Sequence, residues 1–309
     1  MRHGRTRRRL GLALALSAAL AGVPAGDGGT GRAAEPGLSQ WAEPAGASMW
    51  VEGLAAKLRL VAAATTVSGP ALAAGVEIVL EPGWKTYWRV PGDSGVAPSF
   101  DFSGSENVAA VDVAYPVPQR FDAPGDITFG YTGQVVFPLT VTPADPGRPV
   151  VLDGRIVYGV CEALCVPVES HARLAWETGP PEATPFSAVL EDWAGRVPRE
   201  GILSVDAVEA VAGEDGGSLR LSLAVPGPLD APYLIVEPVA GPARVVLGVP
   251  EVMVAGSRVD AAIPVHARRN APGLEAGGRF ELILADRGRA YSAIAVLPPA
   301  SAPGAPQRD

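Results

Sequence analysis

The side chains best suited to chemistry are Cys161 and Cys165, the only two cysteines of the 309-residue chain. Residues 162–164 separate them, and Val166-Pro167 follows. In a straight strand, residues four positions apart are separated by about 13 Å, whereas a disulfide needs Cα atoms about 4.4–6.8 Å apart. A bridge therefore requires a turn between the cysteines. The proline favours a tight loop that returns into a strand.

Three kinds of site fit this pair. In the chain-entropy model a disulfide closing so short a loop contributes only about 2 kcal/mol, against about 4.7 for a loop of 100 residues. This argues for a reactive pair, since short-loop disulfides suit thiol–disulfide exchange. A structural bridge is the second alternative, and a Cu(I) site on two thiolates with His171 nearby is the third. We expect neither thiol to be strongly acidic, because no basic residue adjoins the pair in sequence and Glu162 opposes thiolate formation.

Other chemistry has little support. His171 and His266 occur singly in strand-like runs, where a histidine is usually a surface or hydrogen-bonded residue. No glycine-rich phosphate loop joins a strand to a helix, and no nucleophile-elbow pattern surrounds a serine. The net charge of −8 and the lack of a basic, aromatic-interleaved patch argue against nucleic acid binding. We therefore expect neither a cofactor nor a resident metal.

The N-terminus has the pattern of an export signal. Arginines at positions 2, 5 and 7–9 precede an apolar run, Leu10–Val23, and Val23-Pro24-Ala25 offers a cleavage site. A membrane anchor, the alternative, needs nearer 20 apolar residues. We predict a signal peptide over residues 1–25, a flexible leader over 26–47, and an exported, soluble mature protein.

The body alternates short β-type runs with turn residues, which predicts an all-β chain of two immunoglobulin-like antiparallel sandwiches. Between them, Thr184 and Pro185 suit the start of a helix, and apolar residues follow from Phe186 to Trp193 at helical spacing. The β-type runs of the first half are 57–61, 76–80, 110–115, 134–141, 150–158 and 171–176. The predicted units are a first sandwich over 48–180, a connector helix within 181–197, a second sandwich over 198–298 and a disordered tail over 299–309.

Four separated groups of motifs stand out in the first half. They are residues 82–95 (PGWKTYWRVPGDSG), Tyr115-Pro116 with Arg120-Phe121, Phe129–Gly133 (FGYTG), and Tyr158–Cys161 leading to Cys165-Val166-Pro167. In this order they resemble the periplasmic N-terminal region of DsbD/ScsB-type thiol:disulfide interchange reductases. The resemblance covers about residues 48–178, and more weakly the helix and the second sandwich. The spacing of three residues between the cysteines is the ScsB-like version rather than the longer DsbD-like one.

The resemblance implies an immunoglobulin-like domain whose Cys161–Cys165 pair is a redox shuttle. It also implies an aromatic cap over the cysteines, for which Phe129 and Tyr131 are the candidates. By ordinary strand patterning, the aromatic residues of 84–88 are expected to pack in the core or at an edge, with Lys85 and Arg89 pointing outward.

The resemblance further implies redox partners. Because this sequence shows no counterpart of the family's polytopic membrane domain or thioredoxin-like domain, we expect electrons to come from a separate DsbD/CcdA-like membrane transporter. They would pass to periplasmic thioredoxin-like proteins. We thus predict a monomeric periplasmic protein acting as a protein-disulfide reductase, with Cys165 as the attacking sulfur because Val166-Pro167 fixes its backbone. The alternatives are a non-catalytic two-module adaptor or chaperone with a structural disulfide, and a Cu(I)-handling protein.

Overall fold

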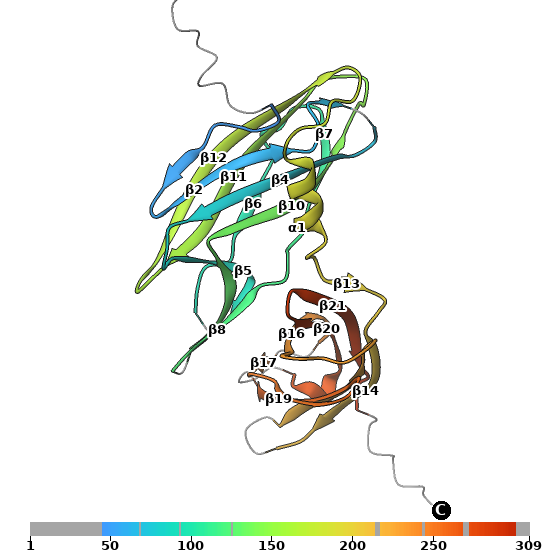
Figure 1. Cartoon of the computed structure of the whole chain (residues 1–309). Coiled ribbons are helices and arrows are strands. Elements are labelled where there is room, and N and C mark those ends of the chain that lie inside the picture. Colours follow the sequence, from blue (N-terminus) through green and yellow to red (C-terminus); the bar gives the residue numbers. More distant parts are fainter. Residues whose placement is uncertain are drawn as a thin grey trace, which may run out of the picture. The chain divides into compact units, whose positions relative to one another are not determined.

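A computed structural model describes residues 45–67, 69–92, 94–124, 126–213, 217–242, 245–267 and 272–300. Strands make up most of this part of the chain, and the fold is all-β, as predicted (Figure 1). The predicted signal peptide, almost all of the predicted leader and most of the predicted tail lie outside the described residues.

The first sandwich comprises strands β1 to β12. They are β1 (Val51–Gly53), β2 (Ala56–Ala62), β3 (Thr66–Val67), β4 (Leu72–Leu80), β5 (Lys85–Gly92), β6 (Ser99–Asp101), β7 (Val108–Val113), β8 (Gln119–Ala123), β9 (Asp126–Thr132), β10 (Gln134–Pro143), β11 (Val150–Cys161) and β12 (Cys165–Thr178). One sheet has the order β1-β2-β4-β10-β7. The other has the order β3-β12-β11-β5-β9-β8, with β6 also paired to β11. The short β12–β3 pair is parallel, and the other described pairs of this sandwich are antiparallel.

Strand β12 shows how the sequence produces these sheets. Every second residue from Val168 to Trp176 is buried, and the residues between them are exposed. This period of two is what a strand with one face on a core requires. The strands thus bury one face each, and the two sheets enclose a core that includes Trp88, Phe137 and Trp176.

Helix α1 (Ser187–Ala194) covers the outer side of the β4–β10 pair (Figure 1). Its Leu190 and Trp193 are buried, which explains why β4 is buried on almost its whole length. The helix begins two residues later than its predicted start at Pro185. Thr184 still acts near this end, because its Oγ1 accepts a hydrogen bond of 3.1 Å from the Phe186 backbone N–H.

The second sandwich comprises strands β13 to β21 and its own core of aliphatic residues with Phe280 and Tyr291. The strands are β13 (Arg199–Glu200), β14 (Ser204–Val211), β15 (Ser218–Ala224), β16 (Tyr233–Ala240), β17 (Val245–Leu247), β18 (Glu251–Ala255), β19 (Arg258–Ala267), β20 (Gly278–Asp286) and β21 (Arg289–Leu297). Its sheets have the orders β13-β21-β20-β16 and β14-β15-β19-β17, and β18 also pairs with β19. A short 3-10 helix, η2 (Leu274–Ala276), precedes β20.

Candidate thiol–disulfide site

The two cysteines close the hairpin between β11 and β12. Residues 162–164 form the turn, and Cys161 and Cys165 are directly opposite each other in the ladder, with Cα atoms 4.2 Å apart and a disulfide between them. The expected tight loop returning into a strand is therefore present. The two cysteines differ in exposure, because Cys161 is only 6% exposed whereas Cys165 is an exposed residue. Leu164, at the turn, is 78% exposed.

Strand β5 brings Lys85 and Tyr87 to the same face of the sheet as the cysteines. In the antiparallel β5–β11 pair, Lys85 is opposite Cys161, and residues opposite each other project to the same face. Tyr87, two residues further on, returns to that face. Thr86, which lies between Lys85 and Tyr87, holds β5 against β11, because its Oγ1 donates a buried hydrogen bond of 2.7 Å to the Gly159 carbonyl oxygen.

Tyr87 makes a direct contact with the sulfur of Cys165. Its hydroxyl is 2.8 Å from Cys165 Sγ, and it must donate this hydrogen bond because a disulfide sulfur carries no proton. Burial raises the pKa of Tyr87 above its usual value, and the charge of Asp126 adds to this effect. The phenol is therefore protonated at neutral pH. It can donate equally to a thiolate at Cys165.

Lys85 reaches from β5 toward the β8–β9 hairpin. Its Nζ donates a hydrogen bond of 2.8 Å to Thr128 Oγ1 and lies 4.9 Å from the centre of the Phe121 ring and 5.5 Å from that of Tyr87. Phe121 and Thr128 are opposite each other in the β8–β9 ladder, and this register places both on the disulfide face. Among the described residues, no carboxylate forms an ion pair with Lys85.

The two rings suggested for the cap lie on the other face of β9. Tyr131 is 4% exposed, donates a hydrogen bond of 2.7 Å to the Pro116 carbonyl oxygen and packs edge-to-face on Phe137. Phe129 stacks on Tyr233 of the second sandwich, with ring centres 6.4 Å apart. The described contacts do not bring either ring to the cysteines.

Sequence reasoning missed Lys85, Tyr87 and Phe121 as members of the site. Alternation within residues 84–89 was the available signal, since it separates Lys85 and Tyr87 from Trp88, which is fully buried in the core as expected. Arg89 was expected to point outward. Its Nη2 instead lies 2.9 Å from Glu281 Oε2 of the second sandwich.

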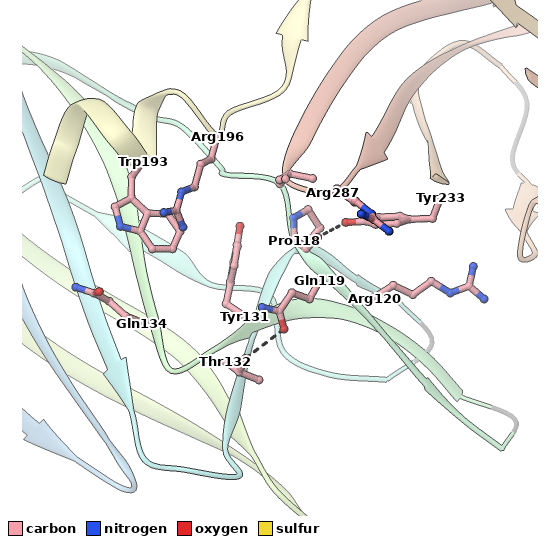
Figure 2. A pocket seen from close by; sticks show the side chains of 12 residues that line it. Pro118, Gln119, Arg120, Tyr131, Thr132, Gln134, Trp193, Arg196, Tyr233 and Arg287 are labelled. Atoms are coloured by element: carbon pink, nitrogen blue, oxygen red, sulfur yellow. Dashed lines mark hydrogen bonds between the residues drawn. The ribbon is translucent and has the colours of Figure 1, made fainter. Parts of the chain in front are cut away.

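A second concave site is the cleft of about 640 Å³ shown in Figure 2. Tyr131 lines it, together with Trp193 and three arginines. Each arginine is already paired with an aspartate: Arg120 with Asp122, Arg196 with Asp192 and Arg287 with Asp230. The cleft lining holds no cysteine or histidine. The disulfide face is therefore the better candidate for chemistry.

The third alternative was a Cu(I) site on the two thiolates, with His171 suggested as a neighbour. In the structure His171 Nε2 hydrogen-bonds to Asp153 on the neighbouring strand β11. Among the described residues, no group of three or more histidine, cysteine, aspartate or glutamate side chains comes together.

Comparisons with known proteins agree with this geometry. Residues 57–175 match the family model described as thiol:disulfide interchange protein DsbD, N-terminal, and residues 196–300 match a domain of unknown function. The crystal structure of the N-terminal periplasmic domain of ScsB from Proteus mirabilis is similar, with 25% sequence identity and a TM-score of 0.65. The match covers 84% of this chain and 100% of that one. No curated protein matches the sequence.

The described residues contain no helix with the length and apolarity needed to cross a bilayer. The pair of sandwiches, the cysteine hairpin and the matched family model all agree with the motifs found in the sequence. The chain is thus similar, in sequence and in fold, to the periplasmic N-terminal region of DsbD/ScsB-type thiol:disulfide interchange proteins.

Proposed function

We propose that this protein is a periplasmic thiol:disulfide interchange protein in which Cys165 exchanges with partner proteins and Cys161 resolves the mixed disulfide. One observation carries the assignment of roles. Cys165 is exposed and accepts a hydrogen bond from the buried Tyr87 hydroxyl, whereas Cys161 is 6% exposed and beyond easy reach of a partner.

The reaction follows from these positions. In the reduced protein, the Cys165 thiolate attacks one sulfur of a partner disulfide, and the partner's other sulfur leaves as a thiolate. The Cys161 thiolate then attacks Cys165 Sγ, which reforms the intramolecular disulfide and releases the second partner thiolate. Two electrons have passed to the partner, whose thiolates take up protons according to their pKa values. Reduction of the Cys161–Cys165 disulfide by a separate dithiol protein completes the cycle.

The electron source and acceptors follow the resemblance. We assign reduction to a DsbD/CcdA-like membrane transporter and oxidation to periplasmic thioredoxin-like proteins. For the aromatic cap, the disulfide face offers Phe121, whereas Phe129 and Tyr131, the rings that the resemblance suggested, lie on the other face of β9. Phe121 is the ring whose position on that face is supported by the β8–β9 register.

Single-cysteine variants expressed in the native host test the proposal. We expect Cys161→Ala to accumulate a covalent complex that disappears on reduction, because Cys165 attacks but nothing resolves the product. Cys165→Ala should trap nothing, and the double variant serves as the matched control. The purified wild-type protein, equilibrated with dithiothreitol buffers, should show a reduction potential above about −300 mV, the range below which structural disulfides lie. A lower potential together with no trapped complex would establish a permanent bridge, and the adaptor function would replace this one.

A further inference from the structure

We propose that Lys85 is the counter-ion of the thiolate that forms when the Cys161–Cys165 disulfide is reduced. Lys85 does not react itself. It is a positioning residue whose charge sets how readily the Cys161–Cys165 disulfide is reduced. The inference rests on the proposed function, which it deepens, and it gives a role to a residue that the sequence placed only on the outward side of its strand.

The register of the sheet places Lys85 beside the pair. It is directly opposite Cys161 in the β5–β11 ladder, and Cβ atoms of such residues are about 4.5–5.5 Å apart on the same face. Cys165 is in turn opposite Cys161 and shares that face. The lysine ammonium sits on a flexible four-carbon stem, so it can move toward a neighbouring charge without any change in the backbone.

Among the described residues, the charge of Lys85 has no anionic partner in the oxidised protein. Its Nζ is held by the Thr128 hydroxyl and by the faces of the Phe121 and Tyr87 rings, which are neutral groups. No ion pair involves Lys85 in the part of the chain that the structure describes. By contrast, Arg59 at the opposite sheet is paired with Glu77 at 2.6 Å. A half-buried ammonium without a charged partner, placed beside a disulfide, can neutralise the negative charge that forms on a cysteine sulfur when the disulfide is reduced.

The other ionisable groups that the structure describes around the pair do not supply a positive charge. Tyr87 donates a hydrogen bond to Cys165 but is neutral. Asp126 at the start of β9 accepts a hydrogen bond of 2.8 Å from Ser94, and Glu162 lies in the turn itself beside Gly83. Both carboxylates oppose a thiolate, so the compensating charge comes from Lys85 on β5.

This arrangement changes the chemistry in a defined direction. An external dithiol supplies two electrons and becomes a disulfide, the S–S bond of this protein breaks, and one sulfur takes a proton while the other stays a thiolate. A cation within reach favours the thiolate over the thiol. Because stabilising the thiolate stabilises the reduced protein, Lys85 raises the reduction potential and increases the fraction of attacking thiolate at neutral pH.

The chain offers a closely matched control, since Lys57 is its only other lysine. Lys57 is on β2 in the opposite sheet, and its Nζ also lies over an aromatic ring, 4.6 Å from the centre of Trp50. Lys57→Gln therefore removes the same charge from the same kind of environment, away from the cysteines. Lys85→Arg keeps the positive charge and should restore the behaviour of the wild type.

The experiment measures alkylation of the reduced full-length mature protein by iodoacetamide as a function of pH, and its equilibrium with dithiothreitol. We expect Lys85→Gln to raise the pH midpoint of alkylation by about one unit, the low end of the effect of a close opposite charge. At a pH above both midpoints, where the thiolate predominates in both proteins, the equilibrium should shift about tenfold toward the disulfide, which corresponds to about 30 mV for two electrons. Lys57→Gln and Lys85→Arg should match the wild type.

Equal midpoints and equilibria for Lys85→Gln and Lys57→Gln would overturn the proposal, and so would a failure of Lys85→Arg to restore both quantities. If Lys85→Gln does not fold, Lys85 can be acetylated in the folded Lys57→Gln protein, which removes its charge without a refolding step. The Lys85→Arg variant, acetylated in the same way, keeps a positive charge at position 85 and is the comparison. The outcome is separate from that of the proposed function. A potential below about −300 mV in all variants, together with no trapped complex, would reject the exchange function, whereas the shift between the two glutamine variants would still measure the influence of Lys85.

Discussion

Replacing Glu237 by glutamine tests the energetics of a buried carboxylate at the contact between the two sandwiches. Arg89 Nη2 lies 2.9 Å from Glu281 Oε2 and 3.5 Å from Glu237 Oε1. The Glu237 side chain is 12% exposed, and burial raises its pKa from 4.5 to about 7, although the charge of Arg89 opposes the shift. Because Glu281 is the closer partner, Arg89 keeps a counter-ion when Glu237 is neutral.

The sign and size of the effect follow from the two pKa values. The folded protein binds this proton more tightly than the unfolded chain, so the stabilisation is fully present below the unfolded pKa of 4.5 and is lost as the pH rises through about 7. At 1.36 kcal/mol per pKa unit, the displacement corresponds to on the order of 3 kcal/mol. We expect Glu237→Gln, which imitates the protonated side chain, to exceed the wild type in free energy of unfolding by up to about 3 kcal/mol near pH 8. The two should agree near pH 4.5.

The assay is urea unfolding at a series of pH values, followed by far-ultraviolet circular dichroism. Circular dichroism is needed because all six tryptophans precede residue 194 and none lies in the second sandwich. Glu281→Gln is the control, and it should lower the free energy of unfolding near pH 8, since it removes the carboxylate closest to Arg89. If Glu237→Gln is less stable than the wild type near pH 8, Glu237 is ionised and paired there, and the reasoning from burial fails.

Two further substitutions test the disulfide face. Tyr87→Phe removes the hydroxyl that donates to Cys165 Sγ, and it should shift the dithiothreitol equilibrium about fivefold toward the disulfide, since hydrogen bonds to charged groups exceed neutral ones by about 1 kcal/mol. An unchanged equilibrium would mean that the hydroxyl does not favour the thiolate. Gly130→Ala places a Cβ 1.9 Å from the Thr86 carbonyl oxygen, where β9 approaches β5, and should cost about 1–3 kcal/mol in urea unfolding. Gly179→Ala, whose Cβ would have its nearest atom at 3.4 Å, is the control, and equal losses in both variants would argue against close approach as the cause.

The all-β fold could be predicted because its strands bury one face, and a period of two is visible in a sequence. The hairpin at the cysteines was also accessible, since two cysteines four residues apart cannot be bridged without a turn. The structure extends both strands to the cysteines themselves, with Val160 opposite Val166 and Cys161 opposite Cys165. The helix begins two residues later than predicted, because Thr184 caps the turn that precedes the helix and not the helix itself.

The members of the site outside the hairpin could not be predicted, because they depend on which strand pairs with which. Lys85 meets Cys161 across 76 positions of sequence only because β5 pairs with β11 at that one register. A shift of one residue would turn Lys85 to the other face and bring its neighbours to the cysteines. Local patterning gives the two faces of β5 but not the register. It therefore could not indicate that Lys85 and Tyr87 face the disulfide.

The alternation of side chains between the two faces of β9 also explains where its aromatic residues lie. Thr128 is on the disulfide face and holds Lys85, whereas Phe129 is on the opposite face and stacks on Tyr233. The Tyr233 hydroxyl also donates a hydrogen bond to the carbonyl oxygen of Pro118, just before β8. The β8–β9 hairpin is therefore held from one face by Lys85 beside the disulfide and from the other by the second sandwich. Substitutions at Tyr233 and at Lys85 act on the same hairpin, although only Lys85 lies beside the sulfurs.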